Sequence, residues 1–375
     1  MTRRAARVMN GTPVMDKILV INIGSTSTKV GLFQGLEALF KETVGHGPEA
    51  LSGLQGHRDW LRFHRACVHR VLEARARELD GLALVMSRGG LSRPVAGGAY
   101  GIDEPMLRDL ASGEFGWHPC NVGPAIALEI AASRGVRAIV YDTPVTDELE
   151  PLARFSGLEG VDREAAFHVL NQRSAARKAA RKLGIAYERG GFVVGHLGGG
   201  ITVCAHRDGR IVDGTHGLGE GPFTPQRTGS LPLGRVVDLC FSKKYEKDGL
   251  LGLLLRQGGV RSYLGTHNIE EVEGRVARGD EEARLVLEAM AYQISKEIGA
   301  MATVLMGRVD AVVLTGDLCF ASTVIRAVRE RVGFLGRVLV YPGEDELENL
   351  ASGGVRVLAS EEPVKVYHPE PEGAS

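Results

Sequence analysis

Short apolar runs separated by glycine-rich or hydroxyl-rich turns dominate the first half of the chain. The runs at 17–23, 29–33 and 38–44 have the length and β-branched content of strands, and the short turns between them predict an antiparallel meander. Apolar residues at three-to-four spacing then predict a helix over 57–79. The elements expected after it are a strand at 82–86, a helix at 122–133, a strand at 137–141 and a helix at 163–183. This order predicts a mixed sheet with helices on its faces.

The second half of the chain repeats this opening pattern. Strands are expected at 191–196, 201–206 and 210–212, again with a glycine-rich first turn. The elements expected after them are helices at 233–241, 250–255 and 281–306, strands at 311–315 and 337–340, and a helix at 344–358. A chain of 375 residues is too long for one compact core. The repeated pattern therefore predicts two α/β domains.

Composition and charge exclude several classes of partner. The chain carries 45 basic and 46 acidic residues, so it lacks the basic footprint of a nucleic-acid-binding protein. No apolar run approaches the ~20 residues needed to cross a bilayer, and residues 1–13 lack the apolar stretch of a secretory signal. The five cysteines have neither a disulfide framework nor metal-ligand spacing. We therefore expect a cytoplasmic protein whose partners include neither nucleic acid nor a membrane.

Two turns between predicted strands carry residues suited to phosphate. The first turn places Asn22, Ser25, Ser27 and Lys29 together, and their hydroxyls and ammonium are donors for a phosphoryl group. The second is the glycine run 198–200, where the absence of side chains lets backbone N–H groups approach an anion. For the first turn a polar hairpin without a ligand explains the residues equally well.

Charged residues follow other predicted strands and loops. Arg88 and Asp142 each end an apolar strand, at the edge where sites in α/β sheets lie. Arg227 lies in the irregular loop 219–229, and a loop of this length is uncommon unless it has a function. A guanidinium presents a rigid fork that fits carboxylate or phosphate. The competing interpretations are a surface arginine in a glycine turn for Arg88 and a helix or turn cap for Asp142.

A strand, glycine and helix start at 314–317 predict a turn where an adenine ring could lie against the backbone. Its central residues are Gly316 and Asp317. An ordinary βα turn is the alternative interpretation. His196, directly before the second glycine turn, and His118 are histidines beside other candidate motifs.

Taken together, these strings resemble the acetate and butyrate kinase family, within the superfamily of acetokinases, sugar kinases, Hsp70 and actin. The resemblance extends from residue 17 to 367. The strings that carry it are NIGSTSTK at 22–29, RGGL at 88–91, GGAY at 97–100, HLGGG at 196–200, GEGPFTP at 219–225 and YPGEDE at 341–346. The strings at 219–225 and 341–346 look like those of butyrate kinases.

The resemblance implies an α/β fold of two ribonuclease-H-like (actin-like ATPase) domains, with mixed five-stranded sheets and a nucleotide cleft between them. It also implies a homodimer or higher homo-oligomer. We place a disordered leader at 1–15, with Met15 as an alternative start, and the two domains at 16–188 and 189–343. Residues 344–375 would form a C-terminal helix and tail that pack back on the first domain.

By motif position, the resemblance also assigns roles to individual residues. It implies that Arg88, Asp142, Arg227 and His196 are catalytic, with His118 near the transferring phosphate. It implies that Asn22 and Glu346 are associated with Mg²⁺. It implies that ATP or ADP contacts Asn22, Ser25, Ser27, Lys29, Gly198, Gly199, Gly200, Gly316 and Asp317. The family usually has a second glycine where this chain has Asp317.

The function implied is reversible transfer of the ATP γ-phosphoryl group to butyrate or a related short or branched fatty acid. The products are an acyl phosphate and ADP. Acetate or propionate as the acid is one alternative. A sugar or polyol kinase of the superfamily is a second. The third is a nucleotide-binding member whose catalysis is weakened by Asp317.

Overall fold

The computed structural model describes residues 8–9, 12–13 and 16–367. Most of the leader expected at 1–15 lies outside the described residues, apart from the pairing of β1 (Val8–Met9) with β2 (Thr12–Pro13). The chain forms two compact units. The first comprises the described chain up to Val145 together with residues 345–367, and the second is Thr146–Glu344. Within the described chain, no helix combines the length and the apolar content needed to span a bilayer.

The first unit is built on a seven-stranded sheet in the order β14-β7-β8-β6-β3-β4-β5. Its strands are β3 (Lys17–Ile23), β4 (Ser27–Gln34), β5 (Glu37–Gly45), β6 (Leu82–Ser87), β7 (Ala99–Gly101), β8 (Arg137–Tyr141) and β14 (Val364–Lys365). β3, β6 and β8 run parallel, and β4 and β5 form the expected antiparallel meander with β3. The sheet exceeds the expected five strands because the short strands β7 and β14 extend one edge.

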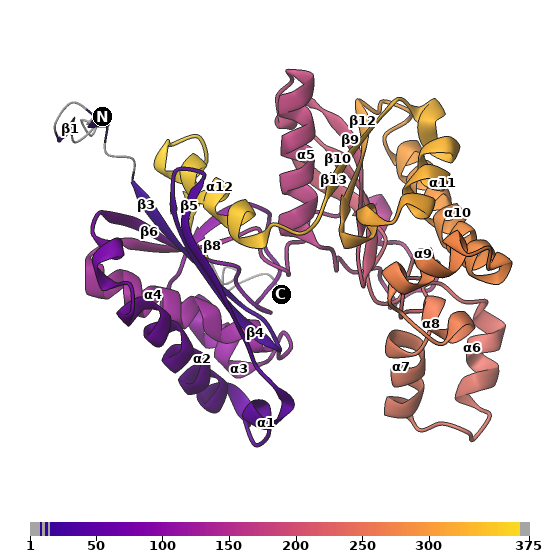
Figure 1. Cartoon of the computed structure of the whole chain (residues 1–375), viewed down its shortest axis with the longest axis horizontal. Coiled ribbons are helices and arrows are strands. Elements are labelled where there is room, and N and C mark those ends of the chain that lie inside the picture. The colour runs from indigo at the N-terminus through magenta and orange to yellow at the C-terminus, as the bar shows by residue number, and fades with distance from the viewer. Residues whose placement is uncertain (1–7, 10–11, 14–15, 368–375) are drawn as a thin grey trace. The chain divides into compact units, whose positions relative to one another are not determined.

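Helices cover both faces of this sheet. The helices of the first unit are α1 (Pro48–Leu51), α2 (Gly56–Glu73), α3 (Glu104–Ser112), α4 (Gly123–Arg134) and α12 (Glu346–Leu358). α2 and α4 pack on the face that carries Leu19 and Ile21, whereas α12 packs against Ile18 on the opposite face (Figure 1). Successive side chains of a strand point to opposite faces, so β3 is apolar along its whole length because both faces are covered.

The second unit contains a five-stranded sheet in the order β11-β10-β9-β12-β13. Its strands are β9 (Gly191–Leu197), β10 (Ile201–Arg207), β11 (Arg210–Gly214), β12 (Ala311–Gly316) and β13 (Arg337–Pro342). β9, β12 and β13 are parallel, and β10 and β11 are antiparallel to β9 and to each other. This arrangement matches β5-β4-β3-β6-β8 of the first sheet, so the duplication read from the sequence extends to strand order.

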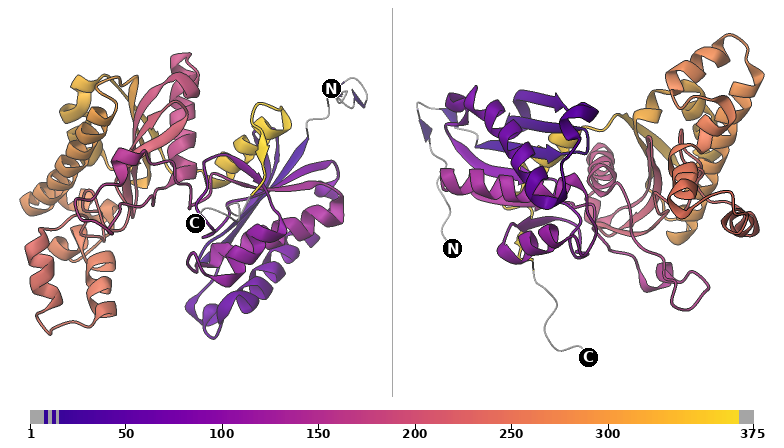
Figure 2. Two further views of the ribbon diagram at one scale, coloured as in Figure 1. Left: turned by 180° about the vertical axis from the view of Figure 1, so that it is seen from behind. Right: turned by 90° about the horizontal axis from the view of Figure 1, so that it is seen from below.

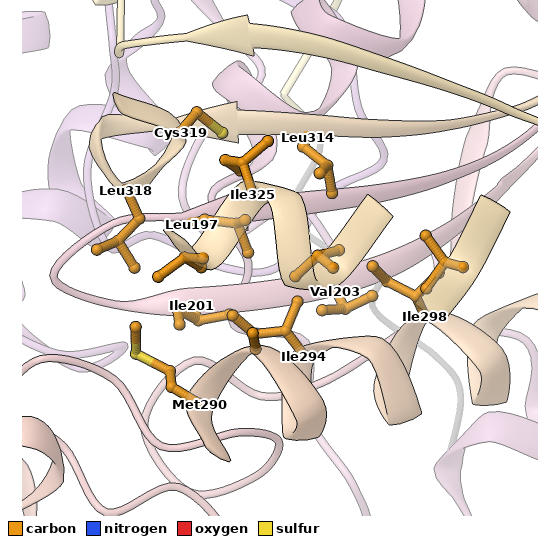
Figure 3. Packing of buried hydrophobic residues seen from close by; sticks show 14 of the residues in the cluster. Leu197, Ile201, Val203, Met290, Ile294, Ile298, Leu314, Leu318, Cys319 and Ile325 are labelled. Carbon is orange, nitrogen blue, oxygen red and sulfur yellow. The ribbon is translucent and has the colours of Figure 1, made fainter. Parts of the chain in front are cut away.

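Helices cover both sides of the sheet of the second unit (Figure 2). They are α5 (Val169–Leu183), α6 (Leu233–Cys240), α7 (Lys247–Arg256), α8 (Gly259–Leu264), α9 (Ile269–Ala277), α10 (Glu281–Val304) and α11 (Ser322–Val332). α10 and α11 form the larger core with Leu197, Val203 and Leu314 (Figure 3). α5 packs on the other face, against Val194 and Val313.

Two expectations about α5 differ from the structure. The helix begins at Val169 and not at residue 163, because Arg163 lies in the preceding loop and binds Glu220 and Asp213 through its guanidinium. α5 also contacts β9 and β12 of the second sheet. The units therefore divide at Val145/Thr146, whereas the sequence interpretation placed the division after residue 188.

Candidate functional site

One cluster of candidate residues in the first unit centres on the carboxylate of Glu346. Glu346 is the first residue of α12, and its Oε2 accepts hydrogen bonds from Asn22 Nδ2 at 2.7 Å and Lys29 Nζ at 2.9 Å. Its Oε1 lies 3.0 Å from Arg88 Nη1. The side chain of Glu346 is only 16% exposed, so this carboxylate joins three donors largely out of water.

Four neighbouring elements bring these side chains together. Asn22 and Lys29 are directly opposite each other in the β3–β4 ladder, and their side chains point to the same face. Arg88 follows the end of β6, the parallel neighbour of β3. α12 begins at Glu346 against the same strands, at residue 346 and not at 344 as expected.

The donor set of this cluster fits an Mg²⁺ ion that is held mainly by phosphate. Asn22 Oδ1 is buried and has no hydrogen-bond partner among the described residues, so an acceptor oxygen is available next to Glu346. The described part of the chain contains no group of three or more His, Cys, Asp or Glu side chains that could hold a metal by themselves. Mg²⁺ usually binds one or two protein ligands together with substrate phosphates and waters.

Ser25 lies in the turn that joins β3 and β4, and Ser27 is the first residue of β4. Ser25 is exposed and Ser27 half-buried, and the turn is closed by a hydrogen bond from the Gly24 N–H to the Ser27 carbonyl. Their assignment to nucleotide binding stays a prediction.

Asp142 has an unusual backbone conformation at the end of β8. Its φ of 42° is in the left-handed region, which glycine adopts freely and which asparagine and aspartate tolerate better than other residues. The residue is buried, and its Oδ1 accepts from the Gly98 N–H at 2.8 Å while the Asp142 N–H donates to the Gly98 carbonyl. Asp142 therefore fixes the loop before β7.

Arg88 and Asp142 follow the ends of two paired parallel strands, β6 and β8. They thus share one edge of the sheet, as the sequence predicted. Burial and the nearby positive charge of Arg88 lower the pKa of His118. A neutral imidazole near Arg88 avoids repulsion between two cations.

A second cluster, in the second unit, surrounds the glycine turn between β9 and β10. The Arg227 guanidinium donates from Nη1 to the Gly217 carbonyl at 2.7 Å, and a Cβ added at Gly200 would lie 2.7 Å from the same nitrogen. The Thr224 hydroxyl donates to the Gly199 carbonyl and accepts from the Arg227 N–H. The loop 219–229 is thereby held on the glycine turn.

Arg227 has no carboxylate partner among the residues that the structure describes. Its Nε is buried without a hydrogen-bond acceptor there, and burial lowers the pKa of the guanidinium. An ammonium or guanidinium withdrawn from water is costly unless an anion compensates it. This arrangement is therefore suited to bind an anion at the turn.

His196, the last residue but one of β9, stacks on a histidine that the sequence interpretation missed. The rings of His168 and His196 are 3.8 Å apart and 12° from parallel. His196 Nε2 lies 3.0 Å from Glu344 Oε1, although not in hydrogen-bond geometry. The helix expected from residue 163 placed His168 in a helix interior and not at a strand end or turn. In the structure α5 begins directly after His168.

Gly316 is the last residue of β12, and Asp317 follows it directly. Gly316 has a φ of 96°, and a Cβ there would lie 2.4 Å from the Leu197 carbonyl oxygen, so only glycine fits. Asp317 is exposed, and it is absent from the described residues with positive φ. The replacement of the family's second glycine is therefore tolerated by the backbone and changes mainly charge and bulk.

Comparison with known proteins agrees with the fold. The model of the Acetokinase family matches residues 155–367. An acetate kinase from Porphyromonas gingivalis is similar in structure, with a TM-score of 0.73, 21% identity, 92% of this chain covered and 100% of that one.

Two further solved structures share the fold. A propionate kinase from Francisella tularensis has a TM-score of 0.69 at 17% identity, covering 90% of this chain and 99% of its own. An acetate kinase from Entamoeba histolytica has a TM-score of 0.71 at 16% identity, covering 90% of this chain and 98% of its own. With two ribonuclease-H-like domains of the actin-like ATPase type and a family match over more than half its length, this chain belongs to the acetokinase family.

Proposed function

We propose that this protein is a carboxylate kinase that transfers the γ-phosphoryl group of ATP reversibly to a short carboxylic acid. The observation that carries the proposal is Arg227, a cation without a carboxylate partner in the described chain, held beside the Gly198–Gly200 turn and the two stacked histidines. Backbone N–H groups, imidazoles and a guanidinium are the donors expected around a transferring phosphoryl group.

The chemistry requires no strong general base. A short carboxylic acid has a pKa near that of a glutamate side chain (~4.3), so it is already ionised at neutral pH. The obstacle is the repulsion between the acid and the nucleotide phosphates. Arg88 and Arg227 would bind the carboxylate and the phosphoryl oxygens, and Lys29 would add a third positive charge. Asp142 would position the loop before β7 and would not abstract a proton.

Mg²⁺ would enter with the nucleotide and screen its phosphate charge. Asn22 and Glu346 are the residues that would hold it, because Asn22 Oδ1 offers a free acceptor beside the Glu346 carboxylate. Lys29 and Arg88, which bind Glu346, would supply positive charge beside the phosphates. Ser25, Ser27, the glycine turn and the Gly316–Asp317 turn would contact ATP or ADP.

For the acid we propose butyrate or a related short or branched fatty acid. The support is the sequence strings at 219–225 and 341–346, which resemble those of butyrate kinases. Residues 94–100, which Asp142 at the end of β8 contacts through Gly98, are the candidate segment for acyl-chain selectivity. One methylene group in an apolar pocket changes the free energy of substrate discrimination by only ~1–3 kcal/mol, so acetate and propionate would compete as substrates. By family resemblance we also propose a homo-oligomer.

The test is formation of acyl phosphate, trapped with hydroxylamine, from ATP, Mg²⁺ and acetate, propionate, butyrate, isobutyrate or valerate. The highest kcat/KM with butyrate or isobutyrate supports the full proposal. The highest value with acetate retains the mechanism and changes the acid. Nucleotide binding without product from any acid would instead support the weakened nucleotide-binding alternative, which the charge of Asp317 favours.

A further inference from the structure

A continuous line of buried hydrogen bonds leads from Tyr187 to His168. Tyr187 Oη lies 2.9 Å from His206 Nδ1, and His206 Nε2 lies 3.1 Å from Gln172 Oε1. Gln172 Nε2 is 2.9 Å from both the carbonyl oxygen and the hydroxyl of Thr202. The Thr202 hydroxyl is 3.1 Å from His168 Nδ1. Gln172, Thr202 and His206 are each fully buried.

The fold places this line beside the candidate site. Gln172 lies on α5, one helical turn after His168, the residue that precedes the helix. Thr202 and His206 lie on the same face of β10. Thr202 is also the cross-strand partner of His196. His168 Cε1 and Arg227 Nη1 both lie close to the position of a Cβ on Gly200, at 3.2 and 2.7 Å.

The backbone carbonyl of Thr202 determines the direction of every bond. A carbonyl oxygen only accepts, so the Gln172 amide must turn its NH₂ group toward Thr202 and its oxygen toward His206. His206 Nε2 must then carry a proton. The ring is buried and its pKa is lowered to about 3, chiefly by burial and then by Arg173 and Arg177, so it is neutral. Its Nδ1 therefore accepts from the Tyr187 hydroxyl.

The same reasoning continues toward His168. The Thr202 hydroxyl oxygen accepts from Gln172, and His168 is its one other hydrogen-bond partner among the described residues. A buried hydroxyl proton without an acceptor would be costly, so this proton points to His168 Nδ1. His168 Nδ1 is then an acceptor, and the ring proton must be on Nε2.

From this network we propose that Gln172, Thr202 and His206 are positioning residues that hold His168 in the neutral Nε2–H tautomer. The inference rests on the proposed function in one respect, that His168 donates this proton to a phosphoryl oxygen. A neutral ring suits that task because a protonated one would repel the Arg227 guanidinium. The network also keeps the ring from turning away when the phosphoryl group is absent.

The direct test reads the tautomer in the resting protein, without substrates. Ring ¹⁵N–¹H correlation spectra of histidine-labelled protein distinguish a nitrogen that carries a proton from one that does not, and the signals of His168 are identified by their loss in His168→Asn. We expect Nε2–H in the natural protein. An Nδ1–H tautomer or a doubly protonated ring near neutral pH would overturn the proposal.

Substitutions at two residues, Thr202 and Gln172, test the direction of the network. Thr202→Val removes the hydroxyl at nearly constant volume, and we expect a mixture of tautomers and a kcat lower by roughly 10–100-fold, the usual effect of losing the partner that orients a functional histidine. The KM for ATP should change less than about threefold, and Thr202→Ser should restore both tautomer and kcat. Gln172→Glu cannot donate to Thr202, so it should favour the Nδ1–H tautomer. Unchanged tautomer and turnover in Thr202→Val would refute the network.

A matched control separates orientation from stability. Thr215→Val also removes a buried threonine hydroxyl in the same unit, one that accepts from the Val203 N–H at 3.0 Å. We expect it to lower the melting temperature while leaving the His168 tautomer and kcat unchanged. If the natural protein forms no acyl phosphate with any acid, the proposed function fails, and the tautomer spectra alone then decide the network.

Discussion

His168 and His196 stack face to face, with ring centroids 3.8 Å apart, although 28 residues separate them in sequence. Two imidazolium rings at this distance would repel each other strongly. His196 Nε2 lies 3.0 Å from Glu344 Oε1.

The stacked pair leads to a first prediction. Replacing His196 by Asn should lower kcat by about 10²–10³, the usual cost of removing one donor from a developing negative charge. The dissociation constant for ADP should change little, because the effect belongs to the transition state. Acyl hydroxamate formation and calorimetric ADP binding give the two values. The exposed residue His267 provides the control, and His267→Asn should behave like the natural protein.

Replacing either candidate arginine by lysine should strongly lower kcat. Arg88→Lys and Arg227→Lys keep the charge but lose the planar fork, so we expect most of the 10³–10⁵-fold loss in kcat attributed to arginine fingers. Single-turnover acyl phosphate formation checks this. Arg235 is 83% exposed on α6, and Arg235→Lys should leave the rate unchanged. Equal rates in all three variants would remove the arginines from the mechanism.

Asp317 should weaken nucleotide binding through its negative charge. Two unit charges about 4 Å apart in water interact by about 1 kcal/mol, so Asp317→Asn should tighten ATP binding about fivefold at low salt. The gain should shrink as ionic strength rises. Titration calorimetry at low and high salt measures both effects. An affinity independent of this substitution would mean that the nucleotide does not approach β12 here.

α12 should depend on a glycine that lets it approach β8. A Cβ at Gly353 would lie 2.8 Å from the Tyr141 ring, so Gly353→Ala should destabilise the protein by about 1–3 kcal/mol. The matched control is Gly299 in α10, where an added Cβ meets nothing within 4 Å. Gly299→Ala should stabilise by up to ~1 kcal/mol through helix propensity. Urea unfolding of both variants provides the comparison.

Stability should fall on acidification because His64 is buried in its neutral form. Its ring is fully buried against Thr28, and burial followed by the charge of His46 lowers its pKa to about 4. Between the unfolded pKa of about 6.5 and about 4, the unfolded chain binds a proton that the folded one does not. The free energy of unfolding should therefore drop as pH falls through this window, by roughly 3 kcal/mol.

Denaturation at pH 7 and pH 5 tests this, with His64→Gln expected to flatten the dependence and to lower stability at pH 7. His267, exposed between α8 and α9, is the control, and His267→Gln should retain the slope. An unchanged slope in His64→Gln would assign the acid sensitivity to other groups.

The local pattern predicted the central strands well. The apolar runs at 17–23 and 137–141 match β3 and β8 residue for residue, because both are covered on two faces and end at turn residues. The short strands β7 and β14 were not predicted, since a strand of two or three residues pairs only when a neighbouring edge is in place. The start of α5 was wrong because Arg163 forms long-range ion pairs that periodicity does not record.

For the site, the sequence by itself determined which residue types stand at strand ends and turns, and hence Asn22, Arg88 and Arg227 as candidates. Only the tertiary structure decided that Asn22, Lys29 and Arg88 meet on Glu346, more than 250 residues away along the chain, and that His168 stacks on His196. The physical reason is the separation along the chain over which each interaction acts. Strand and turn preferences arise from neighbouring residues, whereas partners of a charge or an imidazole are set by the packing of distant elements.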